Sequence, residues 1–343
     1  MSLHALVIVA IGATTLTVAP GVVDRASGVV SFPGAGVAVT PGPFGICNFC
    51  FRDSAQAGYV GVEERVDSSD EFAFNAVVLS AASGRVESNV SMPGPGWAEV
   101  ASAWDPANAT LVRAGFRQPD GKIVDITALD AATGSSTVLS AGVGVTGGIQ
   151  ICEGAMFPGP SGAADGAFYF LTLDGVREAL VEVDVASGRT RDVVLPNVDG
   201  IVTGYSGITA FRTQAGAQRL VALVYNGVAI GPIEVVLIDP ASEGSAANFT
   251  RVAKAPNLCY APAQGSPDVD PATGTFFFTL IKFAVTPDGK GCVDGNGDAA
   301  QPVLIEVDLD SGAWGEKNLT VEGVPRDPTS KDVPIVSLDW SPA

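Results

Sequence analysis

The sequence predicts an all-β protein, and three observations lead to that fold class. Apolar residues make up 47 % of the 343 residues and charged residues 16 %, which provides enough apolar surface for a large core. Glycine (41) and proline (23) are scattered along the chain, as turns between many short strands require. A turn motif, in which a β-rich run is followed by Asp, two residues, Ser or Thr, and then Gly, recurs along the chain. Amphipathic helical patterns are nearly absent, so the repeated unit consists of strands.

The turn motif occurs six times, with Glu243 inserted before the Gly of the fifth copy, and it sets the period of the repeat. Its glycines are Gly28, Gly84, Gly134, Gly188, Gly244 and Gly312. The shortest interval is 50 residues (134 − 84) and the longest is 68 (312 − 244). Strand-rich units of this length are typical of a β-propeller. The Asp of each turn, or Ser80 in the second copy, is expected to accept backbone N–H bonds, and the Gly supplies a positive φ. We therefore interpret these aspartates as structural.

The last residues repeat the beginning of a unit. Leu338-Asp339-Trp340-Ser341-Pro342-Ala343 is similar to Ala103-Trp104-Asp105-Pro106-Ala107, and it stops where the other units turn. Trp104 and Trp340 are expected to be packing residues at equivalent positions. The C-terminal strand, about residues 335–340, is predicted to pair with the N-terminal run 4–11, which closes the ring and removes both free sheet edges.

The sequence thus predicts one domain, residues 1–343, with six blades of four antiparallel strands. The expected blades are the split blade 333–343 plus 1–33, then about 42–91, 96–142, 148–198, 203–254 and 260–322. A seventh blade would require one long unit to hide a degenerate one. Residues 5–19 have a second interpretation as the core of a signal peptide, but no Lys or Arg precedes them and they are rich in β-branched residues. Ring closure favours strands there, with any secretion signal already removed.

Charge and sequence motifs limit the partners and the compartment. The net charge of −18, with only 19 Lys and Arg, disfavours nucleic acids and anionic membrane surfaces. No transmembrane span is evident, and a monomer is expected. Four Asn-x-Ser/Thr sequons favour a secreted protein with surface glycans. The sequon asparagines are Asn89, Asn108, Asn248 and Asn318.

The five cysteines are compatible with one or two disulfides. Cys259 and Cys292 fall in the same blade, one before its first strand and one in an insertion at about residues 291–301. We predict a disulfide between them that holds the insertion over the channel mouth. Cys152 has two candidate partners, Cys47 and Cys50, and the sequence leaves this choice open. The C-x-x-C spacing of Cys47 and Cys50 lacks the βαβ context of a redox motif.

Blade length, turn motif and terminal closure together resemble the six-bladed propeller superfamily. That superfamily includes NHL-repeat proteins, gluconolactonase-type lactonases, squid-type phosphotriesterases and paraoxonases. The resemblance implies the fold, and it does not carry a function, because one fold hosts many activities. Gluconolactonase-like enzymes use a ring of Glu, Asn and Asp ligands, so the resemblance directs attention to oxygen ligands near the channel.

Histidine chemistry is disfavoured, because the only histidine is His4 at the edge of the first strand. Ser-His-Asp and Cys-His relays need a histidine base. Aligning the repeats places four oxygen-bearing side chains near the starts of channel-lining strands, where they would suit Ca²⁺. These candidates are Glu99, Glu153, Gln264 and, more loosely aligned, Asn48. The alternative is a set of polar side chains that wet a water-filled channel.

A second calcium hypothesis concerns the insertion. Asp294, Asn296 and Asp298 alternate with glycine as at the start of a calcium loop, but Ile305 stands where a bidentate Glu is expected at loop position twelve. A plain polar loop is the alternative. Ca²⁺ is the only cofactor that the sequence suggests.

Two functions are compatible with these observations. The first is a secreted module that binds an unknown small ligand or protein at the channel-mouth face. The alternative is a calcium-dependent hydrolase, similar to lactonases or esterases, in which Ca²⁺ polarises a carbonyl and a nearby carboxylate acts as base. We expect the binding module, and whether the protein is an enzyme is left open.

Overall fold

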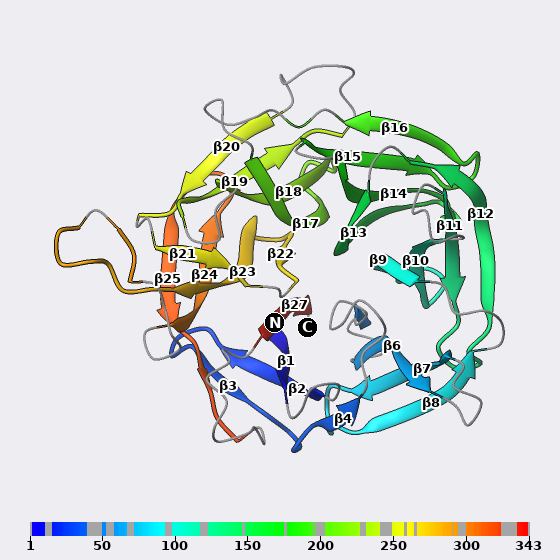
Figure 1. Ribbon diagram of the computed structural model, residues 1–343, viewed down its shortest axis with the longest axis horizontal. Helices are drawn as coiled ribbons and strands as arrows, with labels where there is room; N and C mark the ends of the chain where they lie inside the picture. The colour runs from blue at the N-terminus through cyan, green and yellow to red at the C-terminus, as the bar shows by residue number, and fades with distance from the viewer. Residues whose placement is uncertain are drawn as a thin grey trace. The chain divides into compact units, whose positions relative to one another are not determined.

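The structure is a computed structural model, and it is entirely β in the residues that it describes. The described residues are 2–10, 16–39, 50–52, 58–66, 72–92, 98–116, 123–145, 148–174, 177–193, 195, 203–226, 231–240, 249–256, 259–263, 266–289, 291–293, 300–323 and 335–341. Their strands form six antiparallel sheets, the blades of a six-bladed β-propeller (Figure 1). The predicted fold class is confirmed. The chain divides into two compact units, residues 1–12, 17–35 and 195–343, and residues 13–16 and 36–194.

The first unit holds blades 1, 5 and 6. Blade 1 consists of β27 (Ile335–Ser341), β1 (Ser2–Ala10), β2 (Leu16–Asp24) and β3 (Val29–Ser31), with β26 (Thr320–Val321) parallel to β3. Blade 5 consists of β17 (Thr203–Arg212), β18 (Gln218–Asn226), β19 (Ile233–Ile238) and β20 (Phe249–Lys254). Blade 6 consists of β21 (Tyr260–Pro262) and β22 (Asp268–Asp270), which both pair with β23 (Thr275–Lys282), then β24 (Gln301–Asp308) and β25 (Trp314–Asn318).

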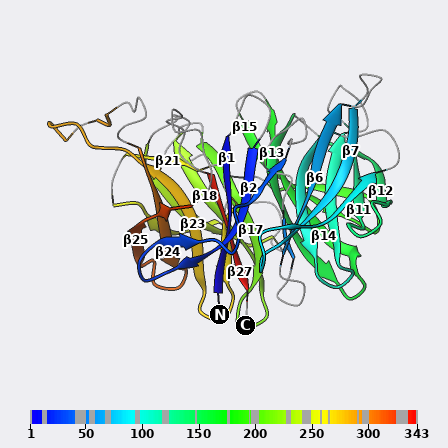
Figure 2. The ribbon, with the colours of Figure 1, turned by 90° about the horizontal axis from the view of Figure 1, so that it is seen from below.

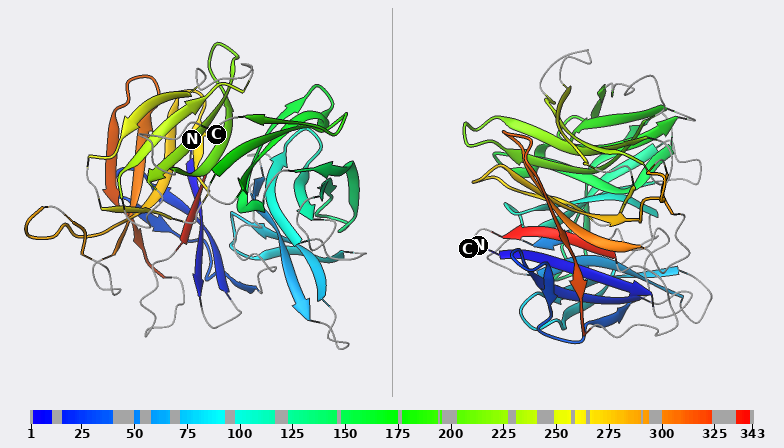
Figure 3. Two further views of the ribbon diagram at one scale, coloured as in Figure 1. Left: turned by 45° about the horizontal axis from the view of Figure 1, so that its top comes forward. Right: turned by 90° about the vertical axis from the view of Figure 1, so that its left-hand side faces the viewer.

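The terminal strands share blade 1, as the sequence predicts. β1 pairs antiparallel with β27 from Ser2 opposite Ser341 to Ile8 opposite Ile335 (Figure 3). Leu3, Ala5 and Val7 of β1 are buried, so this apolar run contributes to the core. The closure of blade 1 by the C-terminal strand is therefore present in the structure.

The second unit holds blades 2, 3 and 4, together with the short strand β4 (Val37–Val39). Blade 2 consists of β5 (Cys50–Arg52), β6 (Gly58–Val66), β7 (Phe72–Ser80) and β8 (Val86–Met92). Blade 3 consists of β9 (Ala98–Asp105), β10 (Thr110–Phe116), β11 (Ile123–Leu129) and β12 (Ser136–Gly144). Blade 4 consists of β13 (Gly148–Gly159), β14 (Gly162–Asp174), β15 (Arg177–Asp184) and β16 (Arg189–Val193).

The repeated aspartate caps the turn between the third and fourth strands of a blade. Asp24 Oδ1 accepts the N–H of Ala26 at 3.0 Å, and Asp24 Oδ2 accepts the Ser27 hydroxyl at 2.6 Å. Gly28 closes the turn with a φ of 73°. The bond from Ser27 and the backbone bond from Ala26 lower the pKa of Asp24, and similar bonds lower the pKa of Asp184 and Asp308. These contacts confirm the structural role that the sequence assigns to the motif.

Apolar cores lie between neighbouring blades of each unit. In the first unit, Phe276 and Phe278 of blade 6 pack with Val221 and Leu223 of blade 5. A second cluster joins Phe277 of blade 6 to β1 and β27. The second unit has equivalent clusters between blades 3 and 4 and between blades 2 and 3. Among the described residues, no helix is long and apolar enough to cross a membrane.

Candidate functional site

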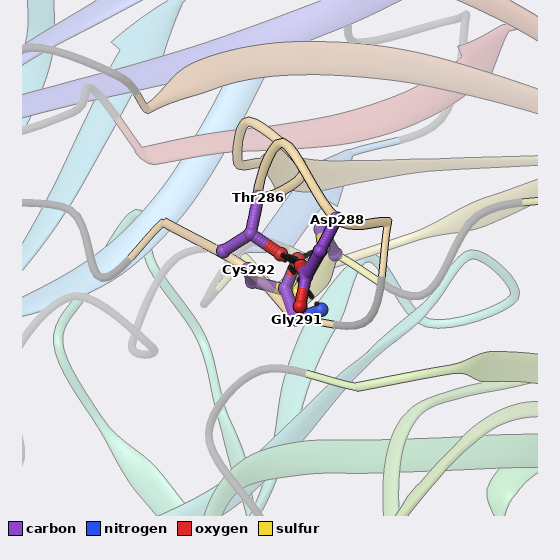
Figure 4. The surroundings of a disulfide bond; sticks show 5 residues. Thr286, Asp288, Gly291 and Cys292 are labelled. Atoms are coloured by element: carbon purple, nitrogen blue, oxygen red, sulfur yellow. Dashed lines mark hydrogen bonds between the residues drawn. A yellow bond between two sulfur atoms is a disulfide. The ribbon is translucent and has the colours of Figure 1, made fainter.

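The connection between β23 and β24 carries the predicted disulfide. Cys259, just before β21, is bonded to Cys292 in this connection (Figure 4). Phe283 N–H also donates to the Cys259 carbonyl at 2.9 Å, at the point where β23 ends. The start of this connection is further held by Glu316 of β25, which accepts hydrogen bonds from the Tyr260 hydroxyl and from the Lys282 ammonium. Burial, followed by the bond to Glu316, raises the pKa of Tyr260.

Beyond its base, the connection folds into a small hairpin, residues 283–289 and 291–293, which we call the blade 6 hairpin. Val285 forms an antiparallel bridge with Cys292, and Val293 N–H donates to the Ala284 carbonyl at 2.8 Å. The Thr286 hydroxyl donates to Asp288 at 2.6 Å and accepts the Gly291 N–H at 2.9 Å (Figure 4). Backbone, side-chain and covalent bonds therefore all fix this hairpin.

The blade 6 hairpin presents apolar side chains to solvent. Val285 is 45 % exposed and Val293 is 38 % exposed. Figures 1 and 2 show the described part of the connection extending past β25, the outer strand of the blade. The sequence predicted a disulfide that holds the insertion over the channel mouth, and the described part instead leaves the blade on its outer side. The disulfide ties this connection to the segment before β21, which pairs with the last residues of β23.

Most of the predicted calcium ligands lie outside the described residues. Asn48 and Gln264 of the channel set fall there, as do Asp294, Asn296 and Asp298 of the loop set. Glu99 and Glu153 lie on described strands, but their side chains are not described. The structure places β9 and β13, which carry these two residues, side by side in the second unit. The calcium sites remain predictions.

The cysteines and sequons that the sequence singles out are divided in the same way. Cys47 and Asn248 fall outside the described residues, and so do the side chains of Cys50 and Cys152. The sequon asparagines Asn89, Asn108 and Asn318 are described and exposed. The Asn89 side-chain oxygen Oδ1 accepts a bond from the Asn75 side-chain amide at 2.8 Å. The Asn108 amide donates to Asp105 Oδ2 at 2.8 Å and to the Ser161 carbonyl at 3.0 Å.

Sequence reasoning missed the residues that join blade 6 to blade 1, which we call the 6/1 seam. Arg25, from the capped turn of blade 1, forms a two-point ion pair with Glu306 of β24, at 3.0 and 3.3 Å. Its guanidinium lies 4.7 Å from the ring centre of Phe277 and 5.6 Å from that of Trp340. The two rings stack at 5.2 Å. The packing role expected for Trp340 is confirmed, whereas nothing in the local sequence around Arg25 indicates its distant partners.

Asp268 is a second missed residue of the 6/1 seam. Its Oδ1 accepts the Val269 N–H at 2.7 Å, and its Oδ2 accepts the Trp340 N–H of β27 at 2.6 Å. Burial raises the pKa of Asp268 to about 6, although these two bonds oppose the shift. Perturbed carboxyl groups often mark functional sites. Here both oxygens bind backbone donors, so Asp268 serves to join two strands.

Comparison with known proteins extends no further than the fold. No protein-family model and no curated protein matches the chain. A candidate 6-phosphogluconolactonase from Bacteroides uniformis matches at 10 % identity over 98 % of this chain and 99 % of that chain, with a TM-score of 0.49. Hydrazine synthase from Kuenenia stuttgartiensis matches at 14 % identity over 81 % and 66 %, with a TM-score of 0.44, so this chain spans about two thirds of it. TolB from Acinetobacter baumannii matches at 13 % identity over 91 % and 68 %, with a TM-score of 0.42. Likeness at this level gives no argument about function.

Proposed function

We propose that this chain is a secreted binding module and that the blade 6 hairpin is its contact element for a protein partner. The observation that carries the proposal is the combination of a rigid backbone with exposed apolar side chains. Single exposed apolar residues are ordinary on protein surfaces. In this hairpin, Val285 and Val293 lie on the two arms of one short element that a disulfide and several hydrogen bonds hold in place.

Rigidity is what makes the hairpin suitable for binding. A loop that is ordered before association loses little conformational entropy when it binds, so more of its contact energy appears as affinity. Val285 and Val293 project from opposite faces of the hairpin, so a partner that encloses the hairpin buries the exposed parts of both. This burial supplies a hydrophobic contribution that scales with the apolar area removed from water. The disulfide, together with the network around Glu316, keeps the arms in register without a partner.

The proposal of a secreted protein is supported by the same disulfide. Disulfides persist in oxidising compartments and are rare in the cytosol of most cells. The exposed sequons Asn89, Asn108 and Asn318 agree with passage through a secretory route. The strongly acidic composition keeps such a module soluble and disfavours anionic partners.

The test is site-specific crosslinking at the hairpin. A photoreactive side chain is placed at position 293, or at the matched control position 138, and the protein is exposed to secreted proteins of its source. Val138 is the control because it is 53 % exposed on β12, in the other unit. We expect a discrete adduct from position 293 only. The adduct should be competed by unlabelled protein and be lost when Val285→Asp is added, because a carboxylate at this contact resists desolvation.

Two outcomes would overturn the proposal. Equal adducts from positions 293 and 138 would show that the crosslinking reports collisions and not a contact site. Hydrolysis of lactones or esters that requires added Ca²⁺ after metal stripping, with no hairpin-dependent adduct, would instead favour the hydrolase. A calorimetric Ca²⁺ titration of the stripped protein is the companion measurement, since the channel ligands remain untested.

A further inference from the structure

A pocket lies between blades 2 and 3, at the junction that we call the 2/3 seam. Its volume is about 350 Å³, which is within the range of small-ligand sites. The walls come from the ends of β7 and β8, from the turn between β9 and β10, and from the capped turn after β11. The residues used below are Val78, Glu87, Trp104, Thr110, Asp130 and Ala131.

The 2/3 seam and the 6/1 seam are built on the same backbone plan. In the 6/1 seam, the turn glycine Gly28 abuts the carbonyl of Asn318 on the last strand of blade 6. In the 2/3 seam, Gly134 abuts the carbonyl of Ser91 on the last strand of blade 2 in the same way. Trp340 lies opposite Leu3, as Trp104 lies opposite Leu111. The two seams can therefore be compared position by position.

The comparison shows why one seam is filled and the other is hollow. Arg25 follows the capping Asp24, and Ala131 follows the capping Asp130. Glu306 and its strand partner Phe277 correspond to Val78 and its strand partner Val60. Each bulky or charged residue of the filled seam is matched by a small apolar residue. The tryptophan alone is kept, so the pocket lies where an arginine and its counter-ion lie in the 6/1 seam.

The polar residues that line the pocket are of two kinds. Two have a buried polar atom without a hydrogen-bond partner among the described residues, and two are carboxylates. The indole nitrogen of Trp104 and the hydroxyl of Thr110 are buried without a hydrogen-bond partner among the described residues. Burial raises the pKa of Asp130, but bonds from Ala132 and Thr133 outweigh it and lower the pKa, so this carboxylate is ionised at neutral pH. Glu87 is the extra residue of a β-bulge opposite Val78 and Leu79. A bulge redirects a side chain, and here it brings a second carboxylate to the pocket.

We propose that the 2/3 pocket binds the guanidinium group of an arginine side chain presented by a partner polypeptide. The 6/1 seam supplies the internal precedent, because Arg25 there occupies the equivalent space over Trp340 and pairs with a carboxylate. In the 2/3 seam, the guanidinium lies against the Trp104 ring, and Glu87 and Asp130 neutralise it. This site is independent of the blade 6 hairpin and goes beyond the proposed function.

The experiment titrates three probes into the intact protein while recording the indole N–H resonances. The first is a capped Gly-Gly-Arg-Gly-Gly peptide, the second has citrulline in place of arginine, and the third is methylguanidinium. The Trp104 resonance is assigned by its loss in Trp104→Phe. We expect the arginine peptide to shift that resonance with a dissociation constant on the order of 1 mM. The neutral citrulline peptide should bind at least about tenfold more weakly, because it lacks the charge that the carboxylates recognise.

Variants of the pocket separate specific binding from attraction to an acidic protein. Ala131→Arg places an internal guanidinium in the pocket and should abolish the shift. Glu87→Gln should weaken binding about fivefold. Glu322→Gln removes the same charge from an exposed site in the other unit and should leave the affinity unchanged. If Ala131→Arg does not fold, the Glu87→Gln and Glu322→Gln pair still decides the question.

Four results would overturn the proposal. Equal binding of the arginine and citrulline peptides would exclude recognition of the charge. Equal weakening by Glu87→Gln and Glu322→Gln would show that the attraction is general. Equal affinity for methylguanidinium and the peptide would assign the pocket to small cations and remove the polypeptide partner. No shift of the Trp104 resonance with any probe would show that the pocket does not bind a guanidinium group.

Discussion

Arg25 in the 6/1 seam and Ala131 in the 2/3 seam occupy the same position of the same turn, one residue after the capping aspartate. Around Arg25 the seam is filled by Phe277, Trp340 and a carboxylate that pairs with the guanidinium. Around Ala131 the tryptophan is kept as Trp104, but valines stand in place of Phe277 and the carboxylate, and a pocket of about 350 Å³ remains over Trp104. The repeat therefore determines where a seam lies, and a few side chains determine whether it holds the blades together or receives a ligand.

Removing Arg25 is expected to have the largest effect, because the filled seam depends on it most. Arg25→Ala deletes a two-point ion pair and contacts with two aromatic rings, and it leaves Glu306 half-buried with Lys317 as its remaining cation at 3.8 Å. We expect the free energy of unfolding to fall by about 2–3 kcal/mol, with the partial exposure of both groups limiting the loss. Denaturant unfolding measures this change.

Two controls accompany the Arg25 variant. Arg85→Ala removes an exposed arginine beside the turn of blade 2 and should change stability by less than about 0.5 kcal/mol. Arg25→Lys should recover only part of the loss, because an ammonium cannot reproduce the planar fork. Equal stabilities of Arg25→Ala and Arg85→Ala would show that the 6/1 seam does not depend on this contact.

The stability of the 6/1 seam should also depend on pH through Asp268. The equivalent position in blade 2 is Cys50, so the 2/3 seam has no carboxyl group at this position. The pKa of Asp268 is raised to about 6 from the 3.8 expected when unfolded. Between these values the folded protein binds the extra proton, so this group's stabilising contribution is present at low pH and is lost as pH rises through about 6. The full shift corresponds to about 3 kcal/mol, of which about 2 kcal/mol should be lost between pH 4 and 7.

Unfolding by urea at pH 4 to 7 tests this dependence. Asp268→Asn should flatten the decline in stability, because the amide has no proton to lose and keeps one acceptor oxygen for the Trp340 N–H. Asp310→Asn, which alters an exposed carboxylate in the turn of blade 6, should leave the decline in place. A parallel decline in the wild type and Asp268→Asn would assign the pH dependence to other groups.

Particular residues show what could be predicted from the sequence. Blade count, capped turns and the pairing of β1 with β27 followed from local chemistry and spacing, since Asp24 and Gly28 act within one turn. The Cys259–Cys292 bond followed from placing both residues in one blade. Arg25 has partners about 250 to 315 residues away, at Phe277, Glu306 and Trp340, so its role depends on register. The pocket exists because Ala131 and Val78 stand where the larger Arg25 and Glu306 stand in the 6/1 seam, and this equivalence depends on strand register. The bulge that places Glu87 is likewise visible only in the strand pairing.

Moving the Arg25–Glu306 ion pair to the equivalent positions of the 2/3 seam should fill the pocket. The effect on stability should be smaller than the effect of losing Arg25. Val78→Glu alone should destabilise the protein, because it puts a carboxylate at a buried position. Adding Ala131→Arg supplies the counter-ion over Trp104. We expect a favourable coupling of about 1 kcal/mol in a double-mutant cycle. The neutral pair Val78→Gln and Ala131→Gln is the matched control, and equal coupling in both pairs would mean that the two seams are not equivalent.

The smallest difference in stability is expected between variants of the sequon asparagines at the two seams. Asn108, beside the 2/3 pocket, donates two hydrogen bonds, one to the fully buried Asp105 and one across to Ser161 in blade 4. In unglycosylated protein, Asn108→Gln should lower the free energy of unfolding by about 1 kcal/mol, because the longer side chain cannot keep both bonds. Asn318, at the 6/1 seam, is exposed, and its backbone carbonyl meets Gly28. Asn318→Gln should therefore change stability by less than about 0.5 kcal/mol. Thermal or denaturant unfolding of the two variants decides the point, and equal losses would show that the Asn108 amide does not brace the rim of the pocket.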